Sequence, residues 1–205
     1  MNTSETLRHK AASTNLRGEE NSLNLPNSIT VLRILLIPVF VWLYLEHTPE
    51  DILLAGLVFA TAAFTDFLDG YLARRSGQIT NLGKLLDPVA DKLLVASGLI
   101  LLVQAQQVAV WLAIVMIARE LIVTGARAVA ANEGFIVQAD SLGKLKVVGQ
   151  IGGILCLIFQ GVWVETQVLL SSIGIILLYV ALVLSLVSGW RYLTLIFKKI
   201  SPQYW

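Results

Sequence analysis

Long runs of apolar residues, separated by short polar breaks, follow one another along the chain after residue 24. Each run is close to the ~20 apolar residues that a helix needs to cross the hydrocarbon layer of a bilayer. The pattern therefore predicts six membrane-spanning helices, and the last is long enough to tilt or to continue along the membrane surface. The predicted helices cover residues 29–45, 52–73, 85–104, 108–131, 142–163 and 168–197.

The composition supports an integral membrane protein. Of the 205 residues, 56% are hydrophobic and 14% are charged, and the mean hydropathy is +0.75. A soluble domain of this size cannot bury so much apolar side chain. Residues 1–24 are polar and lack the apolar centre of a signal peptide. We expect a flexible or interfacial arm over 1–24, a six-helix membrane domain over 25–200 and a short tail over 201–205.

Basic residues lie on one side of this predicted topology. The chain has 15 Lys and Arg residues, and none falls in the breaks at 46–51, 104–107 or 165–167. The positive-inside rule then places both termini and the two basic loops in the cytoplasm, in what we expect to be a bacterial cytoplasmic membrane. The net charge of +1 gives no indication of nucleic-acid binding. Aromatic residues near the outer helix ends are expected to anchor the helices at the interface; they are Trp42, Tyr44, Trp111 and Trp163.

Four aspartates lie within the second and third predicted helices, near their cytoplasmic ends. Asp66 and Asp69 are three residues apart and Asp87 and Asp91 are four apart, so each pair occupies one helix face. Consecutive helices joined by a short loop are antiparallel neighbours, so the pairs can converge. Carboxylate clusters suit hard cations. We predict a site for two divalent ions, Mg²⁺ or Mn²⁺, an arrangement used in phosphoryl chemistry.

A simpler interpretation is that these aspartates only pair with nearby basic residues at the membrane surface. An acidic residue at the centre of a spanning helix costs about 2.5–3.5 kcal/mol, and less near its end. Such residues are rare, so four of them at helical spacing on two neighbouring helices favour a functional site. Arg74 and Arg75 end the second predicted helix beside this cluster and are suitably placed to bind phosphate oxygens. We expect Pro88 to kink the third helix or to mark its opening turn.

The residues from Asp66 to Asp91 fit the pattern D-x₂-D-G-x₂-A-R-x₈-G-x₃-D-x₃-D at every fixed position. This segment resembles the signature of the CDP-alcohol phosphatidyltransferases, and the similarity extends upstream to Pro26 and Arg33. The resemblance implies an all-α bundle of six transmembrane helices around a cytoplasm-facing polar cavity. It also implies a homodimer that transfers a phosphatidyl group from CDP-diacylglycerol to an alcohol.

The same resemblance implies roles for individual residues. Asp66, Asp69 and Asp87 would bind two metal ions, and Asp91 would complete the metal site and act as general base on the acceptor hydroxyl. The cytidine nucleotide of CDP-diacylglycerol would be bound by residues of the motif and its surroundings, namely Asn27, Gly70, Ala73, Arg74 and Thr80.

A second basic cluster bears on the acceptor. Its members lie in the fourth predicted helix and at the start of the fifth, and their charges suit a phosphate dianion. The segment at 118–127 also resembles family members that use glycerol 3-phosphate, although it ends Gly-Ala-Arg where those usually have Gly-Leu-Arg. We therefore expect glycerol 3-phosphate to bind at this cluster, which consists of Arg119, Arg127, Lys144 and Lys146.

Several alternatives stay open at this stage. Lys144 and Lys146 are also what the positive-inside rule alone would place here. The same chemistry with another acceptor, such as phosphatidylglycerol, serine or inositol phosphate, fits the motif equally well. A cation transporter would also use intramembrane aspartates, although these lie near one surface rather than the midplane and no inverted repeat is evident.

Overall fold

The computed structural model describes residues 25–76, 81–132 and 141–200. Within these ranges it describes the side chains of residues 30–65, 88–131 and 143–196. The predicted arm over 1–24 and tail over 201–205 lie outside the described residues. So does Thr80, and the side chains of Asn27, Asp66, Asp69, Gly70, Ala73, Arg74 and Asp87 are likewise not described.

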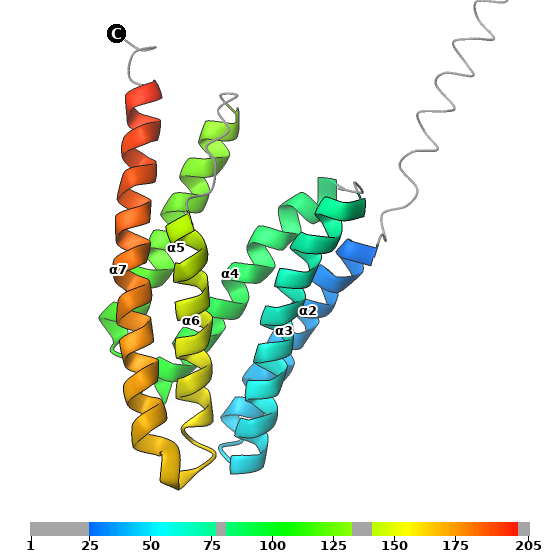
Figure 1. Ribbon diagram of the computed structural model, residues 1–205. Coiled ribbons are helices and arrows are strands. Elements are labelled where there is room, and N and C mark those ends of the chain that lie inside the picture. Colours follow the sequence, from blue (N-terminus) through cyan, green and yellow to red (C-terminus); the bar gives the residue numbers. More distant parts are fainter. Residues whose placement is uncertain (1–24, 77–80, 133–140, 201–205) are drawn as a thin grey trace, which may run out of the picture.

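The described part of the chain is entirely helical, as predicted. Its long helices alternate in direction, so that α2, α4 and α6 run away from the end where the C-terminus lies and α3, α5 and α7 return to it (Figure 1). They are α2 (Leu25–Leu45), α3 (Pro49–Ser76), α4 (Asn81–Gln104), α5 (Val110–Asn132), α6 (Ser141–Phe159) and α7 (Gln167–Ile200), with the short 3₁₀ helix η1 (Val164–Thr166) before α7.

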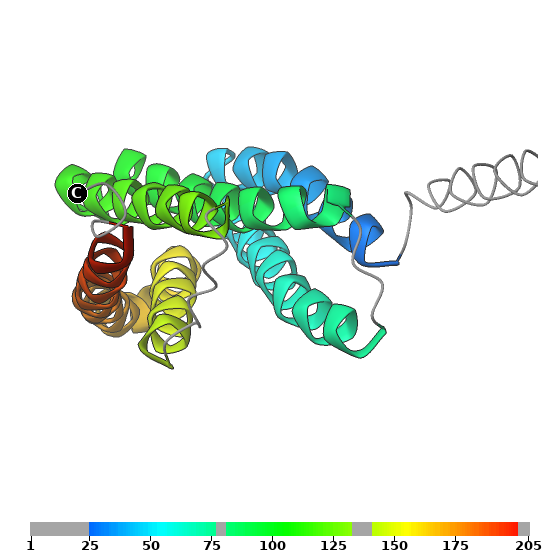
Figure 2. The ribbon, with the colours of Figure 1, turned by 90° about the horizontal axis from the view of Figure 1, so that it is seen from above.

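The helices pack as two pairs with α4 between them. Figure 1 shows α2 beside α3 and α6 beside α7, while α4 slants across the gap, and the view from above in Figure 2 agrees. Close approach in the α6–α7 pair depends on small residues. A Cβ atom added to Gly174 would lie 2.7 Å from Leu157 Cγ and 3.0 Å from the Gly153 carbonyl oxygen, so neither backbone position tolerates a larger side chain without movement.

The turns that follow α2, α4 and α6 form where the polar breaks predicted them. The Asp51 backbone N–H donates to the Thr48 hydroxyl at 3.1 Å, which caps the start of α3. His47 and Gln106 adopt positive φ angles of 58° in the turns after α2 and α4. α6 ends at Phe159, four residues earlier than predicted, because a tight turn follows in which the Gly161 N–H donates to the Ile158 carbonyl at 3.3 Å.

One predicted alternative is excluded and one expectation needs correction. Pro88 lies inside α4, seven residues after the first residue of that helix, which excludes the opening turn and leaves the alternative of a proline within the helix. Tyr44 is only 4% exposed and packs against Phe40, with 6.2 Å between ring centroids, so it belongs to the core rather than to an interfacial belt. Its position on α2 faces the interior, whereas Trp42, two residues earlier, is exposed.

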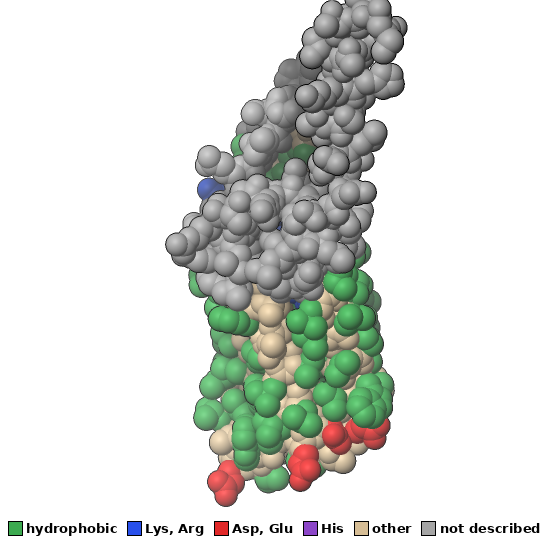
Figure 3. All heavy atoms as spheres, turned by 90° about the vertical axis from the view of Figure 1, so that its right-hand side faces the viewer, with side chains coloured by type: hydrophobic (Ala, Val, Ile, Leu, Met, Phe, Trp, Pro, Cys, Tyr) green, Lys and Arg blue, Asp and Glu red, His purple; other side chains and the backbone are tan. Residues whose placement is uncertain are grey.

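The outer surface of the bundle is largely apolar. Figure 3 shows hydrophobic side chains over the middle of one face and acidic side chains gathered at the end opposite the C-terminus. Among the described residues, Val164–Ile196 has the length and composition of a membrane span, with a mean hydropathy of 2.6, and Thr30–Leu45 is a shorter apolar helix. The helices between them carry charged residues toward one end, which shortens their uninterrupted apolar stretches.

Arg33 braces the first two helices near the end at which the aspartate motif lies. This residue of α2 is 1% exposed, and its Nε donates to the carbonyl oxygen of Ala62 on α3 at 3.2 Å. A guanidinium group in an apolar interior requires such partners. Arg33 thereby fixes α3 against α2 one turn before Asp66, so the helix that carries the first two aspartates is held by a buried polar contact.

Candidate active site

The aspartate motif lies where α3 ends and α4 begins. Asp66 and Asp69 occupy the second half of α3, and Asp87 and Asp91 occupy the first half of α4. These two helices are antiparallel and contact each other. The backbone therefore places all four positions toward the same end of the bundle, as the sequence predicts, and Asp91 is the one whose side chain is described.

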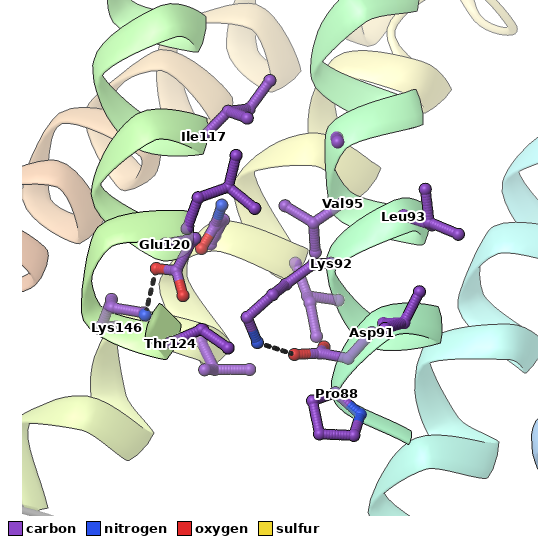
Figure 4. Close-up of a pocket in the computed structure, with 15 residues that line it drawn as sticks. Pro88, Asp91, Lys92, Leu93, Val95, Ile117, Glu120, Thr124 and Lys146 are labelled. Carbon is purple, nitrogen blue, oxygen red and sulfur yellow. Dashed lines mark hydrogen bonds and ion pairs between the residues drawn. The ribbon is translucent and has the colours of Figure 1, made fainter. Parts of the chain in front are cut away.

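The Asp91 side chain lines a pocket of about 340 Å³ between α4, α5 and α6 (Figure 4). The pocket is mostly apolar, with Val95 and Ile117 among its walls, and it carries a small number of ionisable groups. Its volume is at the lower end of the ~300–1,000 Å³ typical of small-molecule sites, and few polar groups among apolar walls are usual in such sites.

The carboxylate of Asp91 is partly accessible from this pocket. Its side chain is 37% exposed, and one oxygen lies 3.5 Å from Nζ of Lys92, the next residue of α4. Because this ion pair is long and uses one of the two carboxylate oxygens, lone pairs of Asp91 remain for a ligand or for a hydroxyl proton.

Arg119 is held by α7 and by its own neighbour Glu120. Its Nε donates to the Ser185 carbonyl oxygen at 2.7 Å and its Nη2 donates to the Ser188 hydroxyl at 2.6 Å. Its Nη1 lies 3.1 Å from the Glu120 carboxylate, although adjacent helix positions do not generally face each other. All three guanidinium nitrogens therefore have partners, and Arg119 joins α5 to α7 as a polar clamp.

Glu120 also forms an ion pair with Lys146 of α6. The Glu120 side chain is largely buried, and that of Lys146 is 7% exposed. One carboxylate thus accepts hydrogen bonds from two cations that belong to different helices. Figure 4 shows this pair on the wall of the pocket that lies across from Asp91 and Lys92. Burying the two cations without this carboxylate would be strongly unfavourable.

The four cations that we expect to bind phosphate fall into two groups. Arg119 and Lys146 are held internally through Glu120, and Lys146 lines the pocket. Arg127 and Lys144 are exposed, and the Arg127 guanidinium carbon lies 5.3 Å from the centroid of the Tyr192 ring. Of the described residues, no hydrogen bond or ion pair joins Arg127 or Lys144 to the internal pair.

Sequence reasoning missed several groups of the site. Ser185 and Ser188 lie in the long apolar helix α7, and only the packing of α5 on α7 identifies them as partners of Arg119. Gln150 also went unnoticed, although it lies four residues after Lys146 and so on the same face of α6. It is buried and lines the pocket. An amide one helical turn from a cation in an otherwise apolar helix is a sequence pattern that can identify such a site residue.

Comparison with known proteins assigns the fold and the motif to a family. The sequence profile described as CDP-alcohol phosphatidyltransferase matches residues 23–187. A Bacillus subtilis (strain 168) protein named CDP-diacylglycerol–glycerol-3-phosphate 3-phosphatidyltransferase is 42% identical over 181 residues, which cover 82% of this chain and 93% of the relative. Two proteins with the same name are similar as well. That of Rickettsia bellii (strain RML369-C) is 36% identical over 169 residues, covering 82% and 93% of the two chains. That of Pseudomonas fluorescens is 51% identical over 115 residues, covering 55% and 58%.

The shared carboxylate of Glu120 makes a prediction about stability. We expect Glu120→Gln and Lys146→Met each to lower the free energy of unfolding, because the first leaves the buried Lys146 ammonium without its carboxylate and the second removes one of the two cations that the Glu120 carboxylate holds. The double variant should be less destabilised than the sum of the two, with a coupling of about 1–3 kcal/mol. Denaturant or thermal unfolding of the detergent-purified protein measures both effects.

The matched control for this cycle is Lys144→Met, which removes an exposed charge two residues away. Its effect on unfolding should stay within about 0.5 kcal/mol. Additive effects of Glu120→Gln and Lys146→Met would contradict the assignment of the pair as a stabilising element.

Proposed function

Because the chain belongs to the CDP-alcohol phosphatidyltransferase family, we propose that it transfers the phosphatidyl group of CDP-diacylglycerol to glycerol 3-phosphate. The products are phosphatidylglycerophosphate and CMP. The observation that carries this proposal is the complete aspartate motif, which lies inside the matched segment of a chain similar over most of its length to relatives named for this reaction. The reaction belongs to phospholipid biosynthesis.

The donor set of the motif suits the two divalent ions that the family uses. Asp66, Asp69, Asp87 and Asp91 would hold Mg²⁺ or Mn²⁺, since all four are carboxylates and hard cations prefer oxygen ligands. When bound, such ions offset the negative charge of the diphosphate and of the leaving CMP. The supporting observations are that α3 and α4 are in contact and that Asp91 keeps lone pairs accessible.

The protein's own residues orient the reactants and move one proton. Asp91 accepts the proton of the acceptor hydroxyl, whose oxygen attacks the phosphorus that carries diacylglycerol. The bond from this phosphorus to the oxygen of CMP breaks, and CMP leaves with the electron pair. No covalent enzyme intermediate is needed. The cytidine nucleotide would be held by residues around the motif, namely Asn27, Gly70, Ala73, Arg74 and Thr80.

The basic cluster supplies the phosphate site for the acceptor. Arg127 and Lys144 are exposed, so they are the cations of this cluster that reach an incoming phosphate directly. Lys146 adds positive potential from the pocket wall, and Arg119 adds it from the α5–α7 clamp. A phosphorylated acceptor is favoured over serine because four cations gather on the side of the site where the acceptor has to bind.

The membrane arrangement is part of the same proposal. All six long helices span the bilayer, and both termini and the pocket face the cytoplasm of a bacterial cell. The confinement of Lys and Arg residues to one side of the topology supports this orientation. CMP then leaves into the cytoplasm, while both lipids stay in the bilayer. We also propose a homodimer, on the basis of the family resemblance.

The function is tested by the release of CMP from CDP-diacylglycerol by the purified protein. Release should require glycerol 3-phosphate and added Mg²⁺ or Mn²⁺, and excess chelator should stop it. Asp87→Asn should lower the rate on the order of a hundredfold or more while the protein still purifies, since it removes a negative ligand.

A panel with serine, inositol phosphate and phosphatidylglycerol tests the acceptor. Faster turnover with any of these would refute our choice of glycerol 3-phosphate.

The division of the basic cluster into exposed and internal cations gives a kinetic prediction. Arg127→Gln should lower kcat/KM for glycerol 3-phosphate by roughly ten- to more than a hundredfold, because it removes a charge-assisted bond to the phosphate. The KM for CDP-diacylglycerol should change far less. Lys144→Gln should have a smaller effect of the same kind, since an ammonium lacks the planar fork of a guanidinium.

Steady-state kinetics with each substrate varied in turn separates the two binding sites. An increase in the KM for CDP-diacylglycerol on Arg127→Gln, with unchanged acceptor kinetics, would assign Arg127 to the donor site and remove it from the acceptor site.

A further inference from the structure

Gln150 is a buried amide whose donor has no partner. It lies on α6 one turn after Lys146, it is 4% exposed, and it lines the pocket between α4, α5 and α6. Its Nε2 is buried and makes no hydrogen bond in the part of the chain that the structure describes. The residues that follow it on α6 include Ile151 and Ile154, so the amide is the innermost polar group on this stretch of the helix.

A buried amide donor without a partner is unfavourable for the folded protein. It has lost its hydrogen bonds to water and gained none in return, whereas an apolar side chain of the same length would carry no such penalty. Most buried polar groups in proteins are satisfied, so an exception that lines a pocket indicates a ligand. The ligand has to offer a hydrogen-bond acceptor, because the unpartnered atom of Gln150 is a donor.

The position of Gln150 defines which part of a ligand it meets. α6 begins at the end of the bundle that carries the aspartate motif, and Lys146 and Gln150, one helical turn apart, both line the pocket. A phosphate bound toward the start of α6, at the Lys146 side of the pocket, leaves the carbon chain of its ester pointing deeper, toward Gln150. Asp91 contributes to the same pocket from α4. A small phosphorylated alcohol that enters this pocket therefore meets both Asp91, the proposed general base, and the amide of Gln150.

We propose that Gln150 is a specificity-determining residue, whose Nε2 donates a hydrogen bond to the secondary hydroxyl of glycerol 3-phosphate. This inference rests on the proposed function and adds to it a residue that recognises the acceptor. The primary hydroxyl is the less hindered nucleophile and loses its proton to Asp91. A donor aimed at that attacking oxygen would withdraw electron density from it, so the amide is better used on the hydroxyl that does not react.

The test compares two acceptors that differ in this one hydroxyl. They are glycerol 3-phosphate and 3-hydroxypropyl phosphate, which keeps the phosphate and the primary hydroxyl. The wild-type protein should prefer glycerol 3-phosphate in kcat/KM by about three- to tenfold or more, as expected for one hydrogen bond. Gln150→Met removes the donor at similar length and volume. It should lower kcat/KM for glycerol 3-phosphate by the same factor and leave that for 3-hydroxypropyl phosphate within about twofold.

A matched control separates this role from packing. Gln160→Met removes another buried amide, just beyond the other end of α6 and outside the pocket lining, and should not change the ratio between the acceptors. If Gln150→Met does not purify as a folded protein, Gln150→Asn takes its place, because it withdraws the amide by one methylene and should also reduce the preference.

Three results would overturn the proposal. They are a wild-type protein without preference between the acceptors, an equal loss with both acceptors on Gln150→Met, and a change confined to the KM for CDP-diacylglycerol. A wild-type protein that releases no CMP with either acceptor contradicts the proposed function itself. That outcome is distinct, because the three others all require an active enzyme.

Discussion

Glu120 accepts hydrogen bonds from Arg119 on its own helix and from Lys146 on α6, and Arg119 in turn donates to two groups of α7. Three helices that carry mostly apolar side chains are thereby joined by polar contacts at one depth. A charge inside an apolar bundle is costly unless it is paired, so each of these groups depends on the others being in place. The arrangement of α5, α6 and α7 near the pocket follows from this constraint.

The same constraint explains how an apolar bundle keeps a site for charged substrates. Lys146 is buried and yet reaches the pocket wall, because Glu120, which lines the same wall, offsets its charge. Asp91 faces the pocket from α4 with Lys92 as a distant partner. The pocket therefore presents ionisable groups of both signs from different helices, and the exposed cations Arg127 and Lys144 lie nearer to water. This gradient suits an acceptor whose phosphate stays near the surface while its hydroxyl enters.

The sequence was sufficient to predict the features that depend on one helix at a time. Apolar runs predicted the helices to within a few residues, and Asp87 and Asp91 lie on one helix, in the first half of α4, as their spacing required. The eight fixed positions of the motif indicated the family without any knowledge of tertiary contacts. The earlier end of α6 was missed because the turn after Phe159 depends on backbone hydrogen bonds rather than on a strong polar break.

Features that depend on the rotation of one helix against another were beyond the sequence. From the sequence, Tyr44 is expected to be an interfacial aromatic. In the structure, the orientation of α2 places its ring against Phe40. Ser185 and Ser188 are two hydroxyls in an apolar helix, and only the docking of α7 on α5 makes them partners of Arg119. Gln150 is a single polar residue in the middle of α6, and only the packed structure shows its amide buried without a partner among the described residues. The three examples share one cause, which is tertiary packing.

The central claim is that the primary hydroxyl of an acceptor bound in the pocket supplies the oxygen that attacks the phosphorus carrying diacylglycerol. Glycerol 3-phosphate labelled with ¹⁸O in its primary hydroxyl tests this claim, with mass spectrometry of both products after turnover by the purified protein. Attack by this oxygen predicts that the label is retained in the new phosphodiester of the lipid and that CMP carries none. Label in CMP, or an unlabelled lipid product, would mean that the acceptor oxygen is not the nucleophile and would contradict the account.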